Sequence, residues 1–187
     1  MSLKRKMLPI GVENFEKLRR NDMYYVDKTE MISDLIMNHG DANLFTRPRR
    51  FGKTLTMDML KTFFEIGQDA SLFDGLTISS HSDICEKYQN KYPVVFISLK
   101  GATGSTYEKA DSMIKQLVAE EYQRHSYLAD SDILDSIEKD QFNRIRSISL
   151  NEGDLENSLR TLTRLLCKHH NQKVILLIDE YDVPLDK

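Results

Sequence analysis

The sequence predicts an α/β fold in which a parallel sheet is flanked by helices, and three observations lead to this prediction. Residues 92–99 and 173–182 contain apolar runs of the kind that form buried parallel strands. Residues 106–129 and 154–170 carry apolar side chains at helical spacing. Residues 44–60 have the pattern of a strand, a basic loop and a helix. Together these segments indicate helices packed on a parallel sheet.

The composition is that of one ordinary globular domain. The 187 residues are 40% hydrophobic and 29% charged, which allows a sizeable core. The net charge of −3 gives no overall attraction to nucleic acid, so such binding would need a local basic patch. No apolar stretch approaches the ~18 residues of a membrane span, and a cytoplasmic location is expected. Cys85 and Cys167 lack metal-ligand spacing and predict two reduced thiols.

Short elements are expected before the basic loop. Residues 11–20 predict an amphipathic helix, and residues 23–26 predict an extended piece. Asp27 or Thr29 is expected to cap a second helix, which has one apolar face and ends near residue 38. Residues 42–46 are the strand that we expect to lead into the loop.

The basic loop carries the chemistry of a phosphate-binding loop. Gly52, Lys53 and Thr54 stand at the start of the predicted helix, where free backbone N–H groups and the helix dipole favour an anion. The glycine permits close approach to phosphates, the lysine supplies a cation, and the threonine hydroxyl can bind Mg²⁺. The general pattern has a further glycine six residues before the lysine, and Arg47 stands there instead. An ordinary helix start with a solvated basic cluster is the alternative.

The rest of the chain predicts a second strand and several helices. Residues 67–80 predict a linking loop. Lys100 follows the strand at residues 92–99, where ligands of open α/β sheets tend to bind, although a surface lysine is the alternative. The remaining predicted helices cover residues 54–64, 82–90, 106–129, 131–149 and 154–170, and the last three form a helical insertion before the final strand.

The final strand ends in a pair of acidic residues. Asp179 and Glu180 follow the apolar run that begins at residue 173. In a P-loop enzyme such an aspartate lies beside Mg²⁺, and the following glutamate orients or deprotonates water. A core strand that meets a polar turn is the alternative. Because the two motifs occur in the right order, each beside a predicted strand end, they favour one shared nucleotide site.

The chain resembles bacterial AAA-ATPase-like proteins, in which the ATPase domain usually precedes a nuclease-like domain of the PD-(D/E)XK type. The resemblance covers residues 8–187 and is carried by the phrases LPIGVENFEKLR, YYVDKTEMI, TRPRRFGKTLTMDML, YPVVFISLKG and VILLIDEYDVPL. It implies an ATP-binding P-loop NTPase fold, with a helical insertion between the Walker A loop and the Walker B strand. Arg47 departs from the general loop pattern but matches this family's own version.

The resemblance also implies particular binding residues. The nucleotide-binding loop would comprise Arg47, Pro48, Arg49, Arg50, Phe51, Gly52, Lys53, Thr54 and Leu55. The segment before the loop usually wraps the adenine, which makes Ile10, Gly11 and Phe15 candidates for the base pocket, with a plain core role as the alternative for Phe15. An NKxD motif for guanine is absent, which favours ATP over GTP. In folds of this type the strand that follows the Walker B strand in the sequence lies between the Walker A and Walker B strands, and the sequence stops before it. We therefore expect an N-terminal fragment whose sheet is incomplete, and either rearranged or left with an unpaired edge that invites self-association.

Three functions remain open at the level of sequence. The first is a Mg²⁺-dependent ATPase domain coupled to a downstream effector. In it Lys53 contacts phosphate, Thr54 and Asp179 bind Mg²⁺, and Glu180 is catalytic. The second is a nucleotide-dependent switch without turnover. The third is nucleic-acid binding through the basic cluster at residues 47–53, in service of a nuclease-like domain. The expected partners are ATP, further copies of the chain, and nucleic acid through that missing domain; no membrane is expected.

Overall fold

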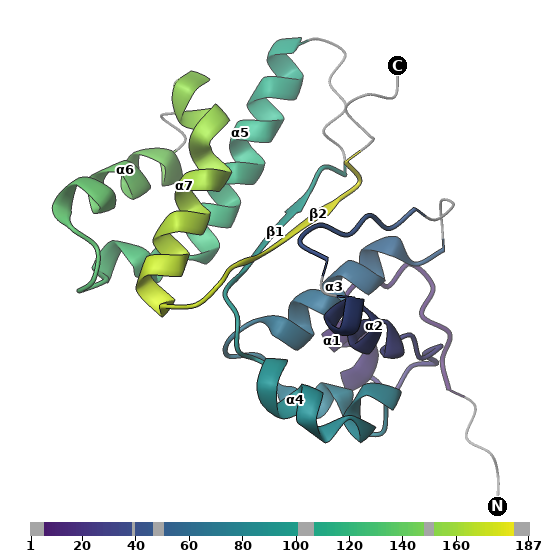
Figure 1. Cartoon of the computed structure of the whole chain (residues 1–187). Helices are drawn as coiled ribbons and strands as arrows, with labels where there is room; N and C mark the ends of the chain where they lie inside the picture. The colour runs from purple at the N-terminus through teal and green to yellow at the C-terminus, as the bar shows by residue number, and fades with distance from the viewer. Residues whose placement is uncertain (1–5, 39, 47–50, 101–106, 148–151, 182–187) are drawn as a thin grey trace, which may run out of the picture. The chain divides into compact units, whose positions relative to one another are not determined.

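The chain forms two compact units in the computed structural model, Met1–Tyr92 and Pro93–Lys187 (Figure 1). The structure describes residues 6–38, 40–46, 51–100, 107–147 and 152–181. Each unit has its own buried core, and each is described by itself below.

The first unit is built from short helices around an aromatic core. Phe73 lies between Phe15 and Phe63, with ring centroids 5.0 Å and 5.2 Å away, and all three side chains are buried. These ring contacts join segments that are far apart in the sequence. The helices are α1 (Phe15–Arg20), α2 (Glu30–Asn38), α3 (Lys53–Phe64) and α4 (Ser82–Tyr88), with 3₁₀ helices η1 (Ala70–Phe73) and η2 (Thr77–Ser80).

Helix α1 begins later than residue 11, where the apolar spacing placed its start. The Asn14 side chain caps it by accepting a hydrogen bond of 2.7 Å from the Lys17 N–H. Gly11, with φ +70°, lies in the left-handed region and so outside the helical conformation. The backbone N–H of Phe15 donates to the Asp58 carboxylate at 2.6 Å, which ties the start of α1 to α3.

Residues 67–80 correct the prediction of a simple linking loop. This segment contains η1 and η2, and it buries Leu72, Phe73, Leu76 and Ile78. Its apolar residues are too few and too irregularly spaced to show a helical or strand period, so the sequence pattern hid their role in the core.

The strand predicted at residues 42–46 is a further correction. The described residues 40–46 form no strand, and Leu44 is exposed. A strand needs a hydrogen-bonded neighbour, which a short apolar run cannot supply by itself. The strand–loop–helix prediction therefore holds for the helix, while Arg47, Pro48, Arg49 and Arg50 lie outside the described residues.

The second unit contains the parallel pair of strands β1 (Val94–Ser98) and β2 (Ile175–Asp179), in register from Val94 with Ile175 to Ser98 with Asp179 (Figure 1). Parallel neighbours need a long crossover, and here it is helical. It comprises α5 (Tyr107–Arg124), the 3₁₀ helix η3 (Ser126–Asp130), α6 (Ser136–Arg146) and α7 (Glu152–His170). The predicted strands at 92–99 and 173–182 are confirmed with shorter bounds, and helices lie between them in the sequence.

Side chains of α5 occupy the edge of β1 that faces away from β2. The Phe96 N–H donates to Glu121 Oε1 at 2.8 Å, and the Arg124 guanidinium donates to the Val94 carbonyl oxygen. Glu121 and Arg124 are also paired with each other, with 2.6 Å between Oε1 and Nη2. These contacts satisfy backbone groups that another strand would otherwise bind, so this edge of the two-stranded sheet is blocked.

Candidate nucleotide-binding site

The first turn of α3 has the features of an anion site. The helix begins at Lys53, after Gly52 with φ +74°, a left-handed conformation that glycine adopts without a steric penalty. No side chain of the described residues caps this end, and no acidic residue lies in the first turn. Because the positive end of the helix dipole is not offset by a local carboxylate, it favours a bound anion.

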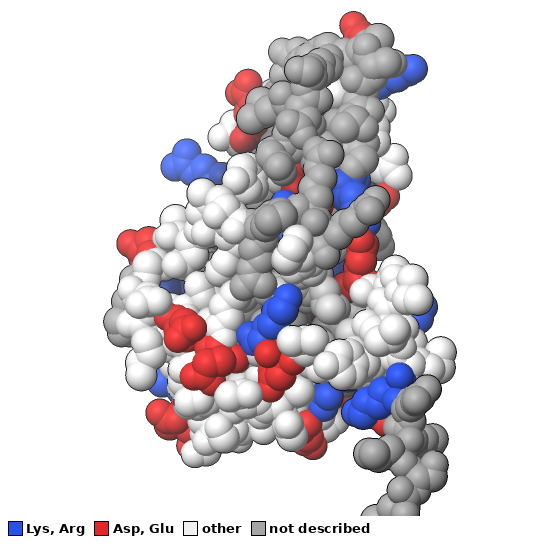
Figure 2. Space-filling model, turned by 90° about the vertical axis from the view of Figure 1, so that its right-hand side faces the viewer, with Lys and Arg blue, Asp and Glu red and all other residues white. Residues whose placement is uncertain are grey.

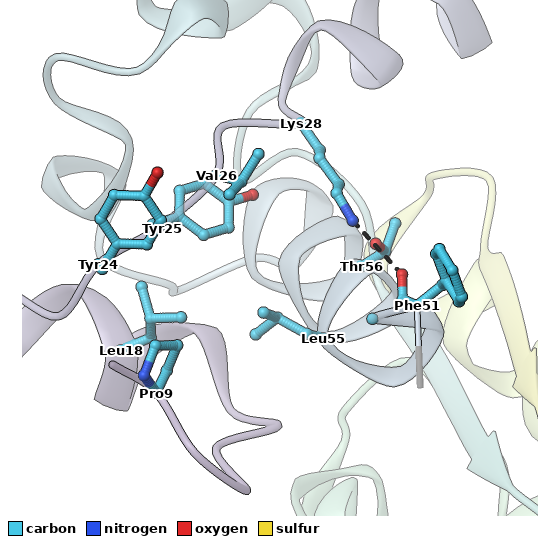
Figure 3. Close-up of a pocket in the computed structure, with 10 residues that line it drawn as sticks. Pro9, Leu18, Tyr24, Tyr25, Val26, Lys28, Phe51, Leu55 and Thr56 are labelled. Carbon is cyan, nitrogen blue, oxygen red and sulfur yellow. Dashed lines mark hydrogen bonds between the residues drawn. The ribbon is translucent and has the colours of Figure 1, made fainter. Parts of the chain in front are cut away.

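A pocket of about 350 Å³ adjoins this helix start (Figure 3). This volume is within the range of roughly 300–1,000 Å³ that is usual for small-molecule sites. The pocket has an apolar and aromatic wall together with a polar end formed by Lys28, Gly52 and Thr56. Its lining consists of Pro9, Leu18, Tyr24, Tyr25, Val26, Lys28, Phe51, Gly52, Leu55 and Thr56.

The aromatic wall comes from residues 24–26, between α1 and α2. The Tyr25 hydroxyl lies 3.2 Å from the sulfur of Met59 on α3, and burial raises the pKa of Tyr25 to about 12. Tyr24, which also lines the pocket, is half exposed. The wall therefore offers an aromatic ring at the rim and a fixed, neutral phenol deeper inside.

The sequence-based candidates for a base pocket do not line it. Ile10 is 89% exposed, Gly11 is exposed, and Phe15 is fully buried in the aromatic core. The adjacent Pro9 and the later segment 24–26 take the lining positions. These lining residues were not predicted from the sequence. The Tyr24-Tyr25 pair was a usable signal, since adjacent tyrosines before a phosphate-binding loop are suited to an aromatic pocket.

The predicted phosphate-loop residues are partly described. Phe51 is 61% exposed at the pocket rim, and Gly52 and Leu55 also line the pocket. Lys53 and Thr54 are half-buried in the first turn of α3, outside the pocket lining.

Asp179 has an unusual environment at the end of β2. It is 2% exposed, and its Oδ2 atom has no hydrogen-bond partner among the described residues. Its backbone carbonyl accepts a hydrogen bond of 2.9 Å from the Leu99 N–H. Buried carboxylate oxygens are normally satisfied, so an unpaired one marks a position suited to a cation or an ordered water.

Glu180 follows in a strained backbone conformation. Its φ of +56° lies in the left-handed region, which non-glycine residues rarely adopt. Such conformations cost about 1 kcal/mol or more and are concentrated at functional sites.

Lys53 and Thr54 belong to the first unit, and Asp179 and Glu180 to the second. The predicted meeting of the two pairs stays a prediction.

The surface charge shows no continuous basic region among the residues coloured in Figure 2. Lysine and arginine side chains are interspersed with aspartate and glutamate on that face.

In the described part of the chain no cluster of three or more His, Cys, Asp and Glu residues is arranged to hold a metal ion. No helix there has the length and apolar character that a bilayer crossing requires.

Comparison with known proteins decides the family. The family described as "Predicted AAA-ATPase" matches residues 9–187, which is nearly the whole chain. The chain belongs to this family. Membership in this AAA-ATPase-like family indicates an ATP-binding domain.

A curated relative from Azotobacter chroococcum mcd 1, named "Uncharacterized protein in vnfD 5'region", is 29% identical over 184 residues. The alignment covers 98% of this chain and 30% of the relative, so the chain spans about a third of the length of the curated relative it matches. No solved structure matches the chain.

Proposed function

We propose that this chain is the nucleotide-binding domain of a Mg²⁺-dependent ATPase that drives or regulates an effector outside the chain. The observation that carries the proposal is the pocket of about 350 Å³ that adjoins the uncapped, acid-free start of α3. Its apolar and aromatic wall suits a purine ring, and the helix start suits the phosphates. Membership in the AAA-ATPase-like family supports ATP as the ligand.

Each predicted site residue has one role in the proposal. Lys53 contacts the phosphates, and the N–H groups of the loop and first turn of α3 cradle them. The Thr54 hydroxyl and the Asp179 carboxylate hold Mg²⁺, directly or through water. Mg²⁺ commonly keeps several waters and takes only one or two protein carboxylates, so these residues fit it. The unpaired buried Oδ2 atom of Asp179 supports this assignment.

Glu180 acts on water rather than on the nucleotide. A carboxylate at this position orients the attacking water and accepts its proton. Mg²⁺, when bound, neutralises the charge that develops on the phosphate oxygens. The strained backbone of Glu180 supports a functional role, because a non-glycine residue in the left-handed region costs stability and such strain is concentrated at functional sites.

The test is turnover of isotope-labelled ATP by the full-length protein and two variants. Lys53→Ala is expected to weaken both ATP binding and hydrolysis. Glu180→Gln is expected to bind ATP like the wild type and to lose hydrolysis, since the amide cannot accept the proton. Equal hydrolysis by all three proteins would refute the assignments.

A nucleotide-dependent switch without turnover is the second candidate, and Arg47 in place of the usual glycine favours it. This candidate expects ATP to stabilise the fold by an amount set by its concentration relative to Kd, with no phosphate release. Nucleic-acid binding through the cluster at residues 47–53 ranks third, and salt-sensitive DNA binding that competes with ATP is its test.

A further inference from the structure

Lys28 is a second lysine at the start of α3, contributed by a segment that lies before α2. Its ammonium nitrogen lies 3.4 Å from the Phe51 carbonyl oxygen (Figure 3). It also lies 3.5 Å from the position that a Cβ atom on residue 52 would take. The side chain is half-buried and lines the pocket. Lys28 therefore reaches the polar end of the pocket from the segment between α1 and α2.

The charge of Lys28 is not balanced within the described structure. The Phe51 carbonyl is a neutral acceptor, and an ammonium group can donate three hydrogen bonds. No described carboxylate forms an ion pair with it, and the first turn of α3 contains no acidic residue. The ammonium thus lies beside the start of α3, at the positive end of its helix dipole. Two sources of positive charge at one place favour a bound anion.

The backbone around Lys28 is held firmly in place. The carboxylate of Asp27 accepts hydrogen bonds of 2.7–2.8 Å from the N–H and hydroxyl groups of both Thr29 and Thr77. The buried hydroxyl of Thr29 accepts a further one, 3.1 Å long, from the Ile78 N–H. Since Asp27 is engaged by these four donors, it is not the counter-ion of the neighbouring lysine. The backbone that carries Lys28 is therefore held in place before any ligand binds, which lowers the entropy cost of using this residue.

We propose that Lys28 supplies a second ammonium group to the phosphate chain of the bound nucleotide, in addition to Lys53. The inference rests on the proposed function and assigns to it a residue outside the phosphate-loop motif. A hydrogen bond to a charged group contributes enough for its loss to weaken binding about 10- to 100-fold. The loss is expected for ATP and not for adenosine, because adenosine has no phosphate for Lys28 to contact.

The experiment is calorimetric titration of the whole chain with ATP in the presence of Mg²⁺, and competition by adenosine. Lys28→Gln is the main variant, because its amide can still donate to the Phe51 carbonyl but carries no charge. We expect it to bind ATP about 10- to 100-fold more weakly and adenosine within about twofold of the wild type. Lys28→Arg, which keeps the charge, is expected to recover most of the ATP affinity. Lys91→Ala, at an exposed lysine of the same unit, is the matched control and is expected to bind both ligands like the wild type.

The outcomes separate this inference from the proposed function. If the wild type binds ATP and Lys53→Ala does not, while Lys28→Gln binds ATP like the wild type, the role of Lys28 is overturned and the proposed function stands. If Lys28→Gln weakens ATP and adenosine equally, Lys28 supports the pocket instead of the phosphates, and the inference also fails. If the wild type binds no ATP, the proposed function itself fails. Melting curves without ligand show whether each variant is folded; if Lys28→Gln is not folded, Lys28 is a structural residue and the inference fails.

Discussion

Glu121 binds the edge of β1, and its lowered pKa should make the stability of the second unit depend on pH in acid. The variant Glu121→Gln tests this dependence. The side chain is buried on α5 and accepts from the Phe96 N–H of β1 at 2.8 Å. Burial alone would raise the pKa of Glu121, but the nearby His125 and Arg124 side chains and the Phe96 N–H outweigh it. Together they lower the pKa from 4.5 to about 2. Glutamine keeps the size of the side chain and removes the charge that pairs with Arg124.

The magnitude follows from the pKa difference. A carboxyl group whose pKa falls from 4.5 to about 2 on folding contributes roughly 3 kcal/mol at pH 7, at about 1.4 kcal/mol per pKa unit. Because the pKa is lower in the folded state, this contribution is complete above pH 4.5 and is lost as the pH falls toward 2. By pH 3 it has dropped to roughly 1.5 kcal/mol. The gap in stability between wild type and Glu121→Gln should shrink by about half between pH 7 and pH 3.

Hydrogen exchange measured by mass spectrometry on peptides of β1 (Val94–Ser98) reports this gap within the second unit. Intrinsic exchange rates are corrected for pH, and the free energy of opening is compared at pH 7 and pH 3. Glu120→Gln is the control, because Glu120 is exposed and should change stability by no more than about 0.5 kcal/mol. A gap that is the same at both pH values, or absent at pH 7, would refute the reasoning.

Three further predictions concern the second unit and its acidic pair. Burial, followed by the charges of His169 and His125, lowers the pKa of His170, so stability should be complete above pH 6.5 and fall as the pH drops below it. His170→Gln, which keeps an acceptor for the Tyr127 hydroxyl at 2.9 Å, should flatten this dependence in melting curves between pH 5 and 7. Glu180→Gly should leave the fold unchanged or up to about 1 kcal/mol more stable, because glycine adopts the left-handed conformation freely, while the full-length protein loses ATP turnover. Asp179→Asn removes a buried carboxylate whose Oδ2 atom has no partner among the described residues, so the chain without ligand should melt no lower than the wild type. The same variant should lose the part of its ATP affinity that depends on Mg²⁺, measured by titration with and without the ion.

The sequence predicted the elements whose pattern is repeated over many residues. Helices α3, α5 and α7 follow from apolar spacing, and β1 and β2 from apolar runs with polar ends. These patterns depend only on residues close in sequence, so they can be recognised without knowing which elements pack beside them in the fold.

The features that the sequence missed depend on contacts between distant segments. The wall of the pocket combines Pro9 and residues 24–26 with α3, some thirty residues later, and none of these wall residues belongs to a periodic pattern. Glu121 and Arg124 look like ordinary surface charges of an amphipathic helix, and only the position of β1 shows that they bind its edge. The strand expected at residues 42–46 fails for the same reason, since a run of apolar residues does not specify a pairing partner.

The buried carboxylates described in the second unit are of two kinds: Glu121 and Glu138 have partners within the fold, whereas Asp179 is a candidate ligand residue. Glu121 is bonded to Arg124 and to the Phe96 N–H, and Glu138 is bonded to Arg164, Lys168 and the Asp135 N–H. In both, partners within the described fold satisfy the charge and lower the pKa to about 2. Asp179 is as deeply buried but leaves Oδ2 without a partner among those residues. The open oxygen of Asp179 supports the proposed Mg²⁺ ligand, and the Mg²⁺ dependence of ATP binding by Asp179→Asn therefore tests that proposal directly.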